Sequence, residues 1–450
     1  MKTMIKFGTD GVRGVANTEL SPELSVKLGK AGAFVLGSGK KSPNILVGKD
    51  TRISSDMLEC ALVAGICSVG ANAHIAGVLP TPGIAALVKK YGLDGGVIIS
   101  ASHNPVQDNG IKFINADGYK LDDSFEAKIE DIINNNHELQ SPTGANVGSC
   151  KFIKSAASEY CDFLKSTMES VSLNGLKVGL DCANGATYHI APDVIKTLGA
   201  SVYTINTEPN GININQNCGS TNMSDLSHFV IKNKLDIGLA FDGDGDRCLA
   251  VDAFGKQLNG DEIMSVCANY LYENKRLNKN TMVTTVMSNI GLKKMAIQNK
   301  INLIQTNVGD RHVLDSMIKN GYNFGGEQSG HIIFLDYNTT GDGILSALQL
   351  LKIMAVKKLP LHTLNTLMIT YPQILVNAYV KSKHKNSFIN NPKVAQAIEQ
   401  AQAQFNDNGR VYIRPSGTEP FIRIMIEGPE ITGIEEAAYR IKNIIEKELI

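Results

Sequence analysis

Three aspartates alternate with glycines directly after the apolar run IGLAF, as Asp242-Gly-Asp244-Gly-Asp246. The glycines allow the chain to curl, so that the carboxylates can point at one place, and carboxylates held so close repel one another unless a cation neutralises them. A ligand set made only of oxygen atoms suits a hard ion such as Mg²⁺. An EF-hand is excluded, since its loop requires Gly sixth and Glu twelfth, where this chain has Arg247 and Ala253. The pattern predicts a Mg²⁺ site of another kind, against the simpler alternative of a solvated acidic turn.

A second candidate follows the apolar run GGVII and reads Ser100-Ala-Ser102-His103-Asn104-Pro105. A serine hydroxyl exposed at the end of a strand can take part in group transfer, and His103 and Asn104 could orient Ser102. The alternative is a serine-containing turn without chemistry. The chain has no Gly-x-Ser-x-Gly elbow, no Walker A sequence and no Gly-x-Gly-x-x-Gly fingerprint. These absences argue against an α/β-hydrolase, an NTPase and a dinucleotide enzyme.

Three more segments combine charged side chains with hydroxyl groups or glycines. The first is the segment RPSGTEP, which is followed by Arg423. Its guanidinium fork, two hydroxyl groups and flexible glycine backbone could together hold a phosphate. GGEQSGH offers a carboxylate, an amide, a hydroxyl and an imidazole for sugar hydroxyls, and FGTDGVRG could bring Arg13 close to an anion. Taken alone, each segment could also be an ordinary turn.

Short apolar runs, each ending in a polar or glycine-rich loop, form the frame for these residues. The runs are ILVGKD, GGVIISASHN, KVGLDCANG, DIGLAFDGDGD, MVTTVMSN and NLIQTNVGD. Apolar spacings of three and four residues predict helices between them, two of which span 54–70 and 343–357. Near-continuous apolar strands alternating with helices predict α/β layers with mostly parallel sheets. Ligands of such sheets bind beyond the carboxyl ends of the strands, where the candidate loops fall.

Changes in composition and rhythm predict four domains, which span residues 1–150, 151–255, 256–368 and 369–450. The polar stretch 134–149 is typical of a linker or surface turn. The last domain differs from the others and is predicted to be a smaller α+β unit. Its expected strands span 374–380, 410–413 and 421–426, and its expected helices span 393–405 and 434–448.

The 450 residues carry 44 basic and 44 acidic side chains, so the formal net charge is zero. A general nucleic-acid or membrane-surface binder would need a basic excess, and we expect neither partner. The eight cysteines form no Cys-x-x-Cys pair and match no zinc or haem spacing, which predicts reduced thiols, with Cys60, Cys67 and Cys267 in the core. No apolar leader and no run of about 18 apolar residues is present, so a cytoplasmic protein is expected.

Taken together and in order, the five motif segments resemble the α-D-phosphohexomutase superfamily over residues 7 to 420. Five ordered motifs are far more specific than any one of them. The resemblance implies a heart-shaped architecture of three mixed α/β domains and a smaller C-terminal α+β domain around a central cleft. At Gln328 the chain resembles the branch of the superfamily that acts on glucosamine phosphates. The branches that act on glucose and mannose phosphates tend to carry Met at this position. His312 stands where that branch leads us to expect Tyr, which is a peripheral departure.

The resemblance also implies roles for individual residues. Ser102 is similar to the serine that carries the transferable phosphate, and this phosphate would complete the Mg²⁺ site of the three aspartates. Glu327 and Ser329 match a sugar-contacting pair. The loop that binds the non-reacting phosphate corresponds to Arg414, Ser416, Gly417 and Thr418, with Arg423 nearby. The basic positions around the transferred phosphoryl group correspond to Arg13, Lys112, Arg247 and His331. Lys112 and His331 are both candidates for the general acid/base, and the sequence does not choose between them.

The implied reaction interconverts glucosamine 6-phosphate and glucosamine 1-phosphate, through a 1,6-bisphosphate that turns round in the cleft, and would feed UDP-N-acetylglucosamine synthesis. Ser102 would first be phosphorylated by an activating bisphosphosugar or by autophosphorylation, and a homodimer is compatible with the resemblance. The nearest rival is the same chemistry on glucose or mannose phosphates. More distant rivals are a Mg²⁺-dependent phosphatase with an aspartate nucleophile and a sugar-phosphate binding protein without turnover.

Overall fold

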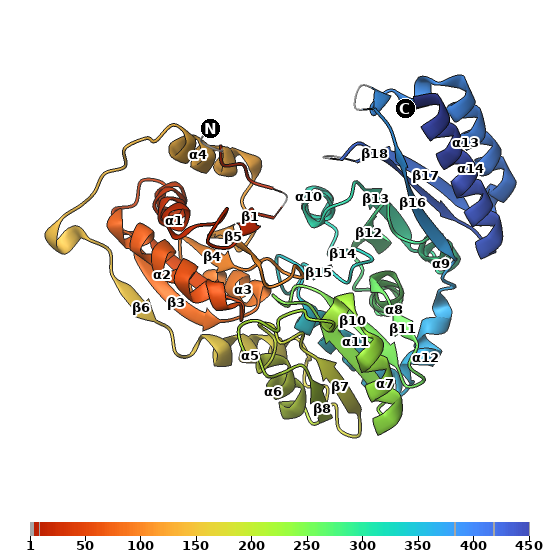
Figure 1. Cartoon of the computed structure of the whole chain (residues 1–450). Helices are drawn as coiled ribbons and strands as arrows, with labels where there is room; N and C mark the ends of the chain where they lie inside the picture. The colour runs from red at the N-terminus through yellow and green to blue at the C-terminus, as the bar shows by residue number, and fades with distance from the viewer. Residues whose placement is uncertain (1–3, 9, 382–383, 417–418, 450) are drawn as a thin grey trace. The chain divides into compact units, whose positions relative to one another are not determined.

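The computed structural model describes residues 4–8, 10–381, 384–416 and 419–449. The chain divides into two compact units, Met1–Met287 with Ile301–Thr366, and Ser288–Lys300 with Leu367–Ile450. Three sheets lie in the first unit and one in the second (Figure 1). Within the described residues, no helix has both the length and the apolar character needed to cross a bilayer.

The first sheet has six strands in the order β1-β5-β4-β2-β3-β6. Strands β4, β2, β3 and β6 run parallel, while β5 returns antiparallel to β4 and also pairs with β1. The strands are β1 (Val12–Val15), β2 (Asn44–Lys49), β3 (Asn72–Val78), β4 (Gly95–Ile99), β5 (Asp108–Asn115) and β6 (Cys150–Phe152). Because β6 belongs to this sheet, the sheet extends two residues beyond the boundary expected at residue 150.

Helices cover both faces of the first sheet (Figure 1). One face carries α1 (Pro22–Gly37), α2 (Ile53–Ser68) and α4 (Asp123–Asn134), whose apolar side chains share a core with the strands. The other face carries α3 (Thr81–Tyr91), where Ile84 lies so close to Gly48 and Gly96 that neither has room for a Cβ. Helix α2 is the helix predicted over 54–70, and it ends before Gly70, whose φ of +85° does not continue a helix.

The second sheet has the order β11-β10-β9-β7-β8 and the third the order β13-β12-β14-β15. In the second sheet, strands β7, β8 and β9 run parallel, and β10 returns antiparallel to β9. In the third sheet, strands β12, β13 and β14 run parallel, and β15 returns antiparallel to β14. The bounds are β7 (Lys177–Asp181), β8 (Ser201–Ile205), β9 (Ile237–Phe241), β10 (Cys248–Asp252), β11 (Gln257–Leu258), β12 (Thr281–Thr285), β13 (Asn302–Thr306), β14 (Phe324–Gly326) and β15 (Ile332–Phe334).

The three sheets of the first unit therefore share one plan, in which a parallel strand turns back into an antiparallel neighbour. The turn between β4 and β5 carries Ser102, the turn between β9 and β10 carries the three aspartates, and the turn between β14 and β15 carries Glu327 and Ser329. The sheets are thus more mixed than the mostly parallel sheets expected. The returning strand β10 is as buried as β9. Its amino-acid composition therefore does not reveal whether it runs parallel or antiparallel to β9.

The remaining helices of the first unit connect and cover these strands. They are α5 (Ala156–Ser166), α6 (Ile190–Thr197), α7 (Ser224–Asn233), α8 (Gly260–Glu273), α10 (Asp310–Asn320), α11 (Gly343–Lys357) and α12 (Leu361–Leu364), with short 3₁₀ turns at 144–146, 219–221 and 278–280. A further 3₁₀ turn, Asn365–Leu367, spans the boundary between the two units. Helix α11 has the bounds predicted for it. Its first turn is capped by Asp342, whose carboxylate accepts a hydrogen bond from the Leu345 N–H at 2.9 Å.

The second unit is an antiparallel sheet in the order β16-β18-β17, covered by two helices. Its elements are β16 (Gln373–Tyr379), β17 (Arg410–Pro415), β18 (Phe421–Glu427), α13 (Pro392–Phe405) and α14 (Ile431–Leu449), with 3₁₀ turns at 388–390 and 406–408. The elements predicted for this part of the chain are confirmed to within three residues at each end. Helix α9 (Ile290–Gln298) also belongs to this unit, because the Arg410 guanidinium donates to the Ser288 carbonyl at 2.8 Å.

All eight cysteines are free thiols, as predicted. The prediction of a buried thiol is confirmed for Cys267, whereas Cys67 is only partly buried and Cys60 is exposed. The prediction for Cys60 was wrong because the buried face of α2 is formed by Leu58, Leu62 and their neighbours. Cys60 stands two residues from each of these, about 200° around the helix, and so faces solvent.

Helices α1 and α2 approach closely through a pair of glycines. A Cβ at Gly65 would lie 2.2 Å from the Val26 carbonyl oxygen, and a Cβ at Gly29 would lie 2.3 Å from that of Leu62. We expect Gly65→Ala to lower the free energy of unfolding by about 1–3 kcal/mol, because the helices must move apart to admit the methyl group. Chemical denaturation would measure this loss. Gly433→Ala in α14 is the control, since its Cβ would meet no atom closer than 3.8 Å, and equal effects of the two changes would contradict the close approach as the cause.

Candidate active site

Ser102 lies in the turn between β4 and β5, where it is buried and has a backbone φ of +53°. A positive φ is unusual for a residue with a Cβ and persists only where the surroundings enforce it. The Ser102 N–H donates to Ser100 Oγ at 2.9 Å, and Ser102 Oγ donates to Asp242 Oδ2 at 2.6 Å. The turn therefore presents the Ser102 hydroxyl to a carboxylate 140 positions further along the chain.

Asp242, Asp244 and Asp246 converge in the turn between β9 and β10. All three are buried, and one oxygen of each lies within 4.8 Å of the others. Oδ1 of Asp244 and Oδ1 of Asp246 have no hydrogen-bond partner among the residues that the structure describes. Burial, and then repulsion from the other two carboxylates, raises the pKa of Asp242 well above its usual range. A cation would relieve this repulsion and coordinate the free oxygens, so the donor set fits a hard divalent ion.

Lys112, on β5, is a buried cation beside the acidic turn. Its Nζ lies 2.8 Å from Asp244 Oδ2 and 2.7 Å from Asp10 Oδ2. Burial alone would lower the pKa of Lys112, but the carboxylates of Asp10 and Asp244 raise it above its ordinary value. Thr81, the first residue of α3, donates its hydroxyl to the same Asp244 oxygen at 2.7 Å. Asp244 is thus bound through Oδ2 by two donors, which leaves Oδ1 for a metal ion.

Two arginines near the acidic turn each have an unsatisfied guanidinium Nε–H. Arg13, on β1, pairs with Asp10, and Nε of Arg247 lies 3.8 Å from an Asp246 oxygen. The buried Nε–H of each arginine has no hydrogen-bond acceptor in the described part of the chain. A buried donor without an acceptor is costly, and a bound anion would supply one. Arginines are well suited to binding phosphate, so the surroundings of the acidic turn favour a phosphate beside the metal ion.

His331, at the end of the turn between β14 and β15, is buried next to the acidic cluster. Its Nδ1 lies 3.4 Å from Asp246 Oδ2, and its Nε2 accepts a hydrogen bond from the Gly341 N–H at 3.1 Å. Burial by itself would lower the pKa of His331, but the carboxylates of Asp246 and Asp310 raise it above its ordinary value. The imidazole is therefore held at the edge of the metal site by contacts on both ring nitrogens.

Glu327 and Ser329 occupy the same turn as His331. The Gly309 N–H donates to Glu327 Oε1 at 3.1 Å, which orients the carboxylate. Ser329 Oγ is buried and has no hydrogen-bond partner among the described residues. A free buried hydroxyl beside an oriented carboxylate can bind the hydroxyl groups of a sugar.

Lys120 and Asp310 were not predicted from the sequence, and Asp10 was given no role. Lys120 Nζ lies 2.7 Å from Asp10 Oδ1 and 2.6 Å from Asp310 Oδ2. It therefore links the first sheet to α10, which supports the third sheet. Asp10 could have been noticed, because it stands in the same motif as Arg13. The pairing of Lys120 with Asp310 carries no local signal, since 190 positions separate them in the chain.

The predicted phosphate loop lies in the second unit. Arg414 on β17 stands directly opposite Arg423 on β18, and Arg423 pairs with Glu419 at 3.0 Å. Ser416 is buried, and its Oγ donates to Glu419 Oε2 at 3.3 Å. Gly417 and Thr418, which were predicted to belong to the same loop, lie outside the described residues.

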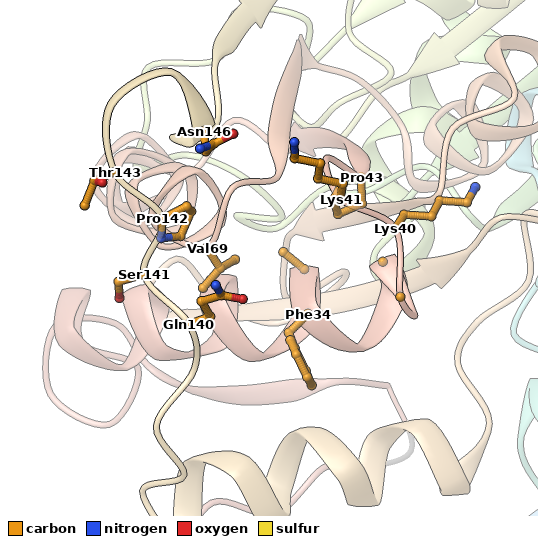
Figure 2. A pocket seen from close by; sticks show the side chains of 13 residues that line it. Phe34, Lys40, Lys41, Pro43, Val69, Gln140, Ser141, Pro142, Thr143 and Asn146 are labelled. Atoms are coloured by element: carbon orange, nitrogen blue, oxygen red, sulfur yellow. The ribbon is translucent and has the colours of Figure 1, made fainter.

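A hollow of about 640 Å³ lies elsewhere in the first unit and contains none of these residues. Figure 2 shows that its lining comes from the helix that carries Phe34 and from the segment that carries Gln140 and Asn146. The residues that line it include no carboxylate. We therefore assign this hollow no part in the chemistry of the acidic turn.

All four domain models of one family match the chain in sequence order. They describe phosphoglucomutase/phosphomannomutase α/β/α domain I over residues 4–140, domain II over 158–255, domain III over 259–371 and the C-terminal domain over 375–443. The chain belongs to the phosphoglucomutase/phosphomannomutase family. In this phosphoglucomutase/phosphomannomutase family member, the acidic turn is a binding site for a divalent metal ion.

Individual relatives agree with this assignment. The phosphoglucosamine mutase of Clostridium tetani (strain Massachusetts / E88) is 53% identical over 443 residues, which cover 98% of this chain and 99% of that protein. A phosphoglucomutase/phosphomannomutase family protein from Burkholderia thailandensis matches with a TM-score of 0.79 and 21% identity, covering 98% of both chains. The N-acetylphosphoglucosamine mutase of Aspergillus fumigatus, solved with GlcNAc-6P and magnesium, matches with a TM-score of 0.70 and 18% identity, covering 99% of this chain and 96% of that one. The two solved structures show the shared fold of the phosphoglucomutase/phosphomannomutase family.

Proposed function

We propose that the chain is an enzyme that interconverts glucosamine 6-phosphate and glucosamine 1-phosphate, with phospho-Ser102 as its phosphoryl donor. The proposal rests on the 2.6 Å hydrogen bond between Ser102 Oγ and Asp242, because a phosphate on that oxygen would lie beside the metal ion. The choice of glucosamine phosphates comes from the C. tetani relative, which is 53% identical over nearly the whole chain.

The metal ion in this proposal is Mg²⁺. Its ligands are Asp242, Asp244, Asp246 and one phosphate oxygen of phospho-Ser102, a set of hard oxygen donors that suits Mg²⁺. When bound, the ion stabilises the negative charge of the transferring phosphoryl group. Magnesium is also the ion in the A. fumigatus structure.

The first transfer moves the phosphoryl group from Ser102 to the sugar. The bond between Ser102 Oγ and phosphorus breaks while the 1-hydroxyl oxygen of glucosamine 6-phosphate bonds to the same phosphorus. The hydroxyl gives up its proton and Ser102 Oγ regains one, with Lys112 and His331 as the candidates for this proton transfer. The products are glucosamine 1,6-bisphosphate and unmodified Ser102. After the bisphosphate turns round, its 6-phosphoryl group returns to Ser102 and glucosamine 1-phosphate is released.

Other side chains would bind the parts of the substrate that do not react. Arg13 and Arg247 would bind the transferred phosphoryl group through their unpartnered Nε–H groups. Glu327 and Ser329 would bind sugar hydroxyls. The non-reacting phosphate would be bound in the second unit by Arg414, Ser416, Gly417, Thr418 and Arg423. A hexose 1,6-bisphosphate or autophosphorylation would supply the first phosphate on Ser102.

Purified protein is expected to convert glucosamine 6-phosphate with a kcat/KM at least about tenfold above that for glucose or mannose 6-phosphate. Its intact mass should exceed that of the unmodified chain by about 80 Da, with the phosphate mapped to Ser102. Comparable kcat/KM values for the three sugar phosphates would contradict a preference for glucosamine phosphates and would indicate a broader specificity for hexose phosphates. Release of one inorganic phosphate per turnover would contradict the mutase reaction and favour a phosphatase.

A further inference from the structure

Two side chains from distant parts of the chain, Arg52 before α2 and Asn215 between β8 and α7, hold the same pair of backbone carbonyls in the turn that carries Ser102. Arg52 Nη2 donates to the Ser102 carbonyl at 3.0 Å and to the Asn104 carbonyl at 2.8 Å. Asn215 Nδ2 donates to the same two carbonyls at 2.8 Å and 3.0 Å. Each of these two nitrogens has two N–H groups, and each of the two carbonyl oxygens has two lone pairs. The four hydrogen bonds therefore use both N–H groups of each nitrogen and both lone pairs of each oxygen.

Arg52 is itself rigidly held. It is only 2% exposed, its Nε donates to Asp50 Oδ2 at 2.9 Å, and its Nη1 donates to the Asp108 carbonyl at 3.1 Å. Asp50 also accepts a hydrogen bond at 2.6 Å from the Ser100 hydroxyl, which in turn accepts from the Ser102 N–H. The Asp50 carboxylate therefore supports both the N–H and, through Arg52, the carbonyl of Ser102.

Asn215 connects the Ser102 turn to the acidic turn. It lies in the segment between β8 and α7, and its backbone N–H donates to the Ala183 carbonyl at 2.9 Å. Gly243, between the first two aspartates, packs against the same contact. A Cβ at Gly243 would lie 2.5 Å from the Ser102 carbonyl oxygen and 2.8 Å from Asn215 Nδ2. The Ser102 carbonyl is thus in close contact with Asn215 and with the backbone that carries the metal ligands.

We propose that Arg52 and Asn215 are positioning residues for phosphoryl transfer, which hold Ser102 at its positive φ and keep its Oγ directed at the acidic turn. This inference rests on the proposed function. Neither side chain contacts the Ser102 hydroxyl, so both act through the backbone carbonyls of Ser102 and Asn104. Because phosphoryl transfer depends on alignment of the reacting atoms, a small displacement of Oγ lowers the rate more than it lowers substrate affinity.

Asn215→Gly tests the proposal, since Asn215 has a φ of +57° that glycine adopts without strain. We expect kcat to fall about 10- to 100-fold, with KM within about twofold of its original value and a higher Mg²⁺ concentration for half-maximal rate. Asn217→Gly is the matched control, because Asn217 has a φ of +54° in the same segment and is exposed. This control should leave kcat and KM unchanged. Arg52→Lys should lower kcat in the same way, because lysine keeps the charge beside Asp50 but lacks the planar fork.

The outcomes separate this inference from the proposed function. If the unmodified protein carries phospho-Ser102 and turns over substrate, but Asn215→Gly retains full kcat, the positioning role is overturned. A fall in kcat that matches only the loss of folded protein in a thermal melt would also overturn it. If the unmodified protein shows neither phosphoserine nor mutase turnover, the proposed function itself fails. Should Arg52→Lys not fold, Asn215→Gly still decides the question.

Discussion

Replacing Ser102 by Ala is expected to reduce mutase turnover by about 10⁴-fold or more, to the detection limit. The change removes the one oxygen that accepts and donates the phosphoryl group in the proposed reaction, and with that oxygen the hydrogen bond to Asp242 is lost. The measurement is conversion of glucosamine 6-phosphate in the presence of Mg²⁺ and a hexose 1,6-bisphosphate, together with the intact mass. The mass should lack the additional 80 Da or so of a phosphoryl group.

The fold should survive this substitution, because the side chain loses one oxygen in a turn that many other bonds hold. Ser166→Ala, at the exposed end of α5, serves as a control for the loss of a serine hydroxyl and should retain full turnover. Both variants should melt within a few degrees of the unmodified protein. Turnover by Ser102→Ala at the original rate would rule out a phosphoserine intermediate at this position.

The second large effect is expected for Asp244→Asn, which preserves shape while removing one of the three charges at the metal site. We expect activity at fixed Mg²⁺ to fall about 10²–10³-fold, because the site loses an anionic ligand and Lys112 loses one of its two carboxylate partners. A Mg²⁺ titration of the rate should shift to higher concentration, and calorimetry should show weaker Mg²⁺ binding. In the unmodified protein, EDTA should abolish turnover and added Mg²⁺ should restore it.

Asp225→Asn is the matched control for this experiment. Asp225 is an exposed carboxylate in the first turn of α7, outside the acidic turn. Its replacement should leave both the rate and the Mg²⁺ titration unchanged. If Asp244→Asn and Asp225→Asn gave the same Mg²⁺ titration, Asp244 would not be a metal ligand.

Much of the local structure could be predicted from the sequence. Helix α11 was predicted with its observed bounds, because an apolar face with spacings of three and four residues depends only on neighbours in the chain. The acidic cluster was predicted for the same reason, since its aspartates lie within five consecutive residues and converge as expected. The strands of the second unit were predicted almost in full, with only their ends misplaced by one or two residues.

The antiparallel strands that return after β4, β9 and β14 were not anticipated. These strands create the three turns that carry the candidate residues, so their direction matters for function. A buried strand is apolar whichever way its neighbour runs, and the pattern of residues therefore did not reveal the direction. The likeness among the three sheets is a property of strand order and is absent from the letters of the chain.

The sequence by itself determined which chemical groups this protein has and how near neighbours are arranged, because turns, helices and the alternating aspartates depend on short stretches of chain. Its resemblance to a family then implied roles for them. Only the tertiary structure decided that the Ser102 hydroxyl meets Asp242, that Lys120 meets Asp310 and that Asn215 holds the Ser102 carbonyl. Each of these contacts joins residues more than 100 positions apart. Such contacts follow from the order and direction of strands in packed sheets, which local composition does not encode.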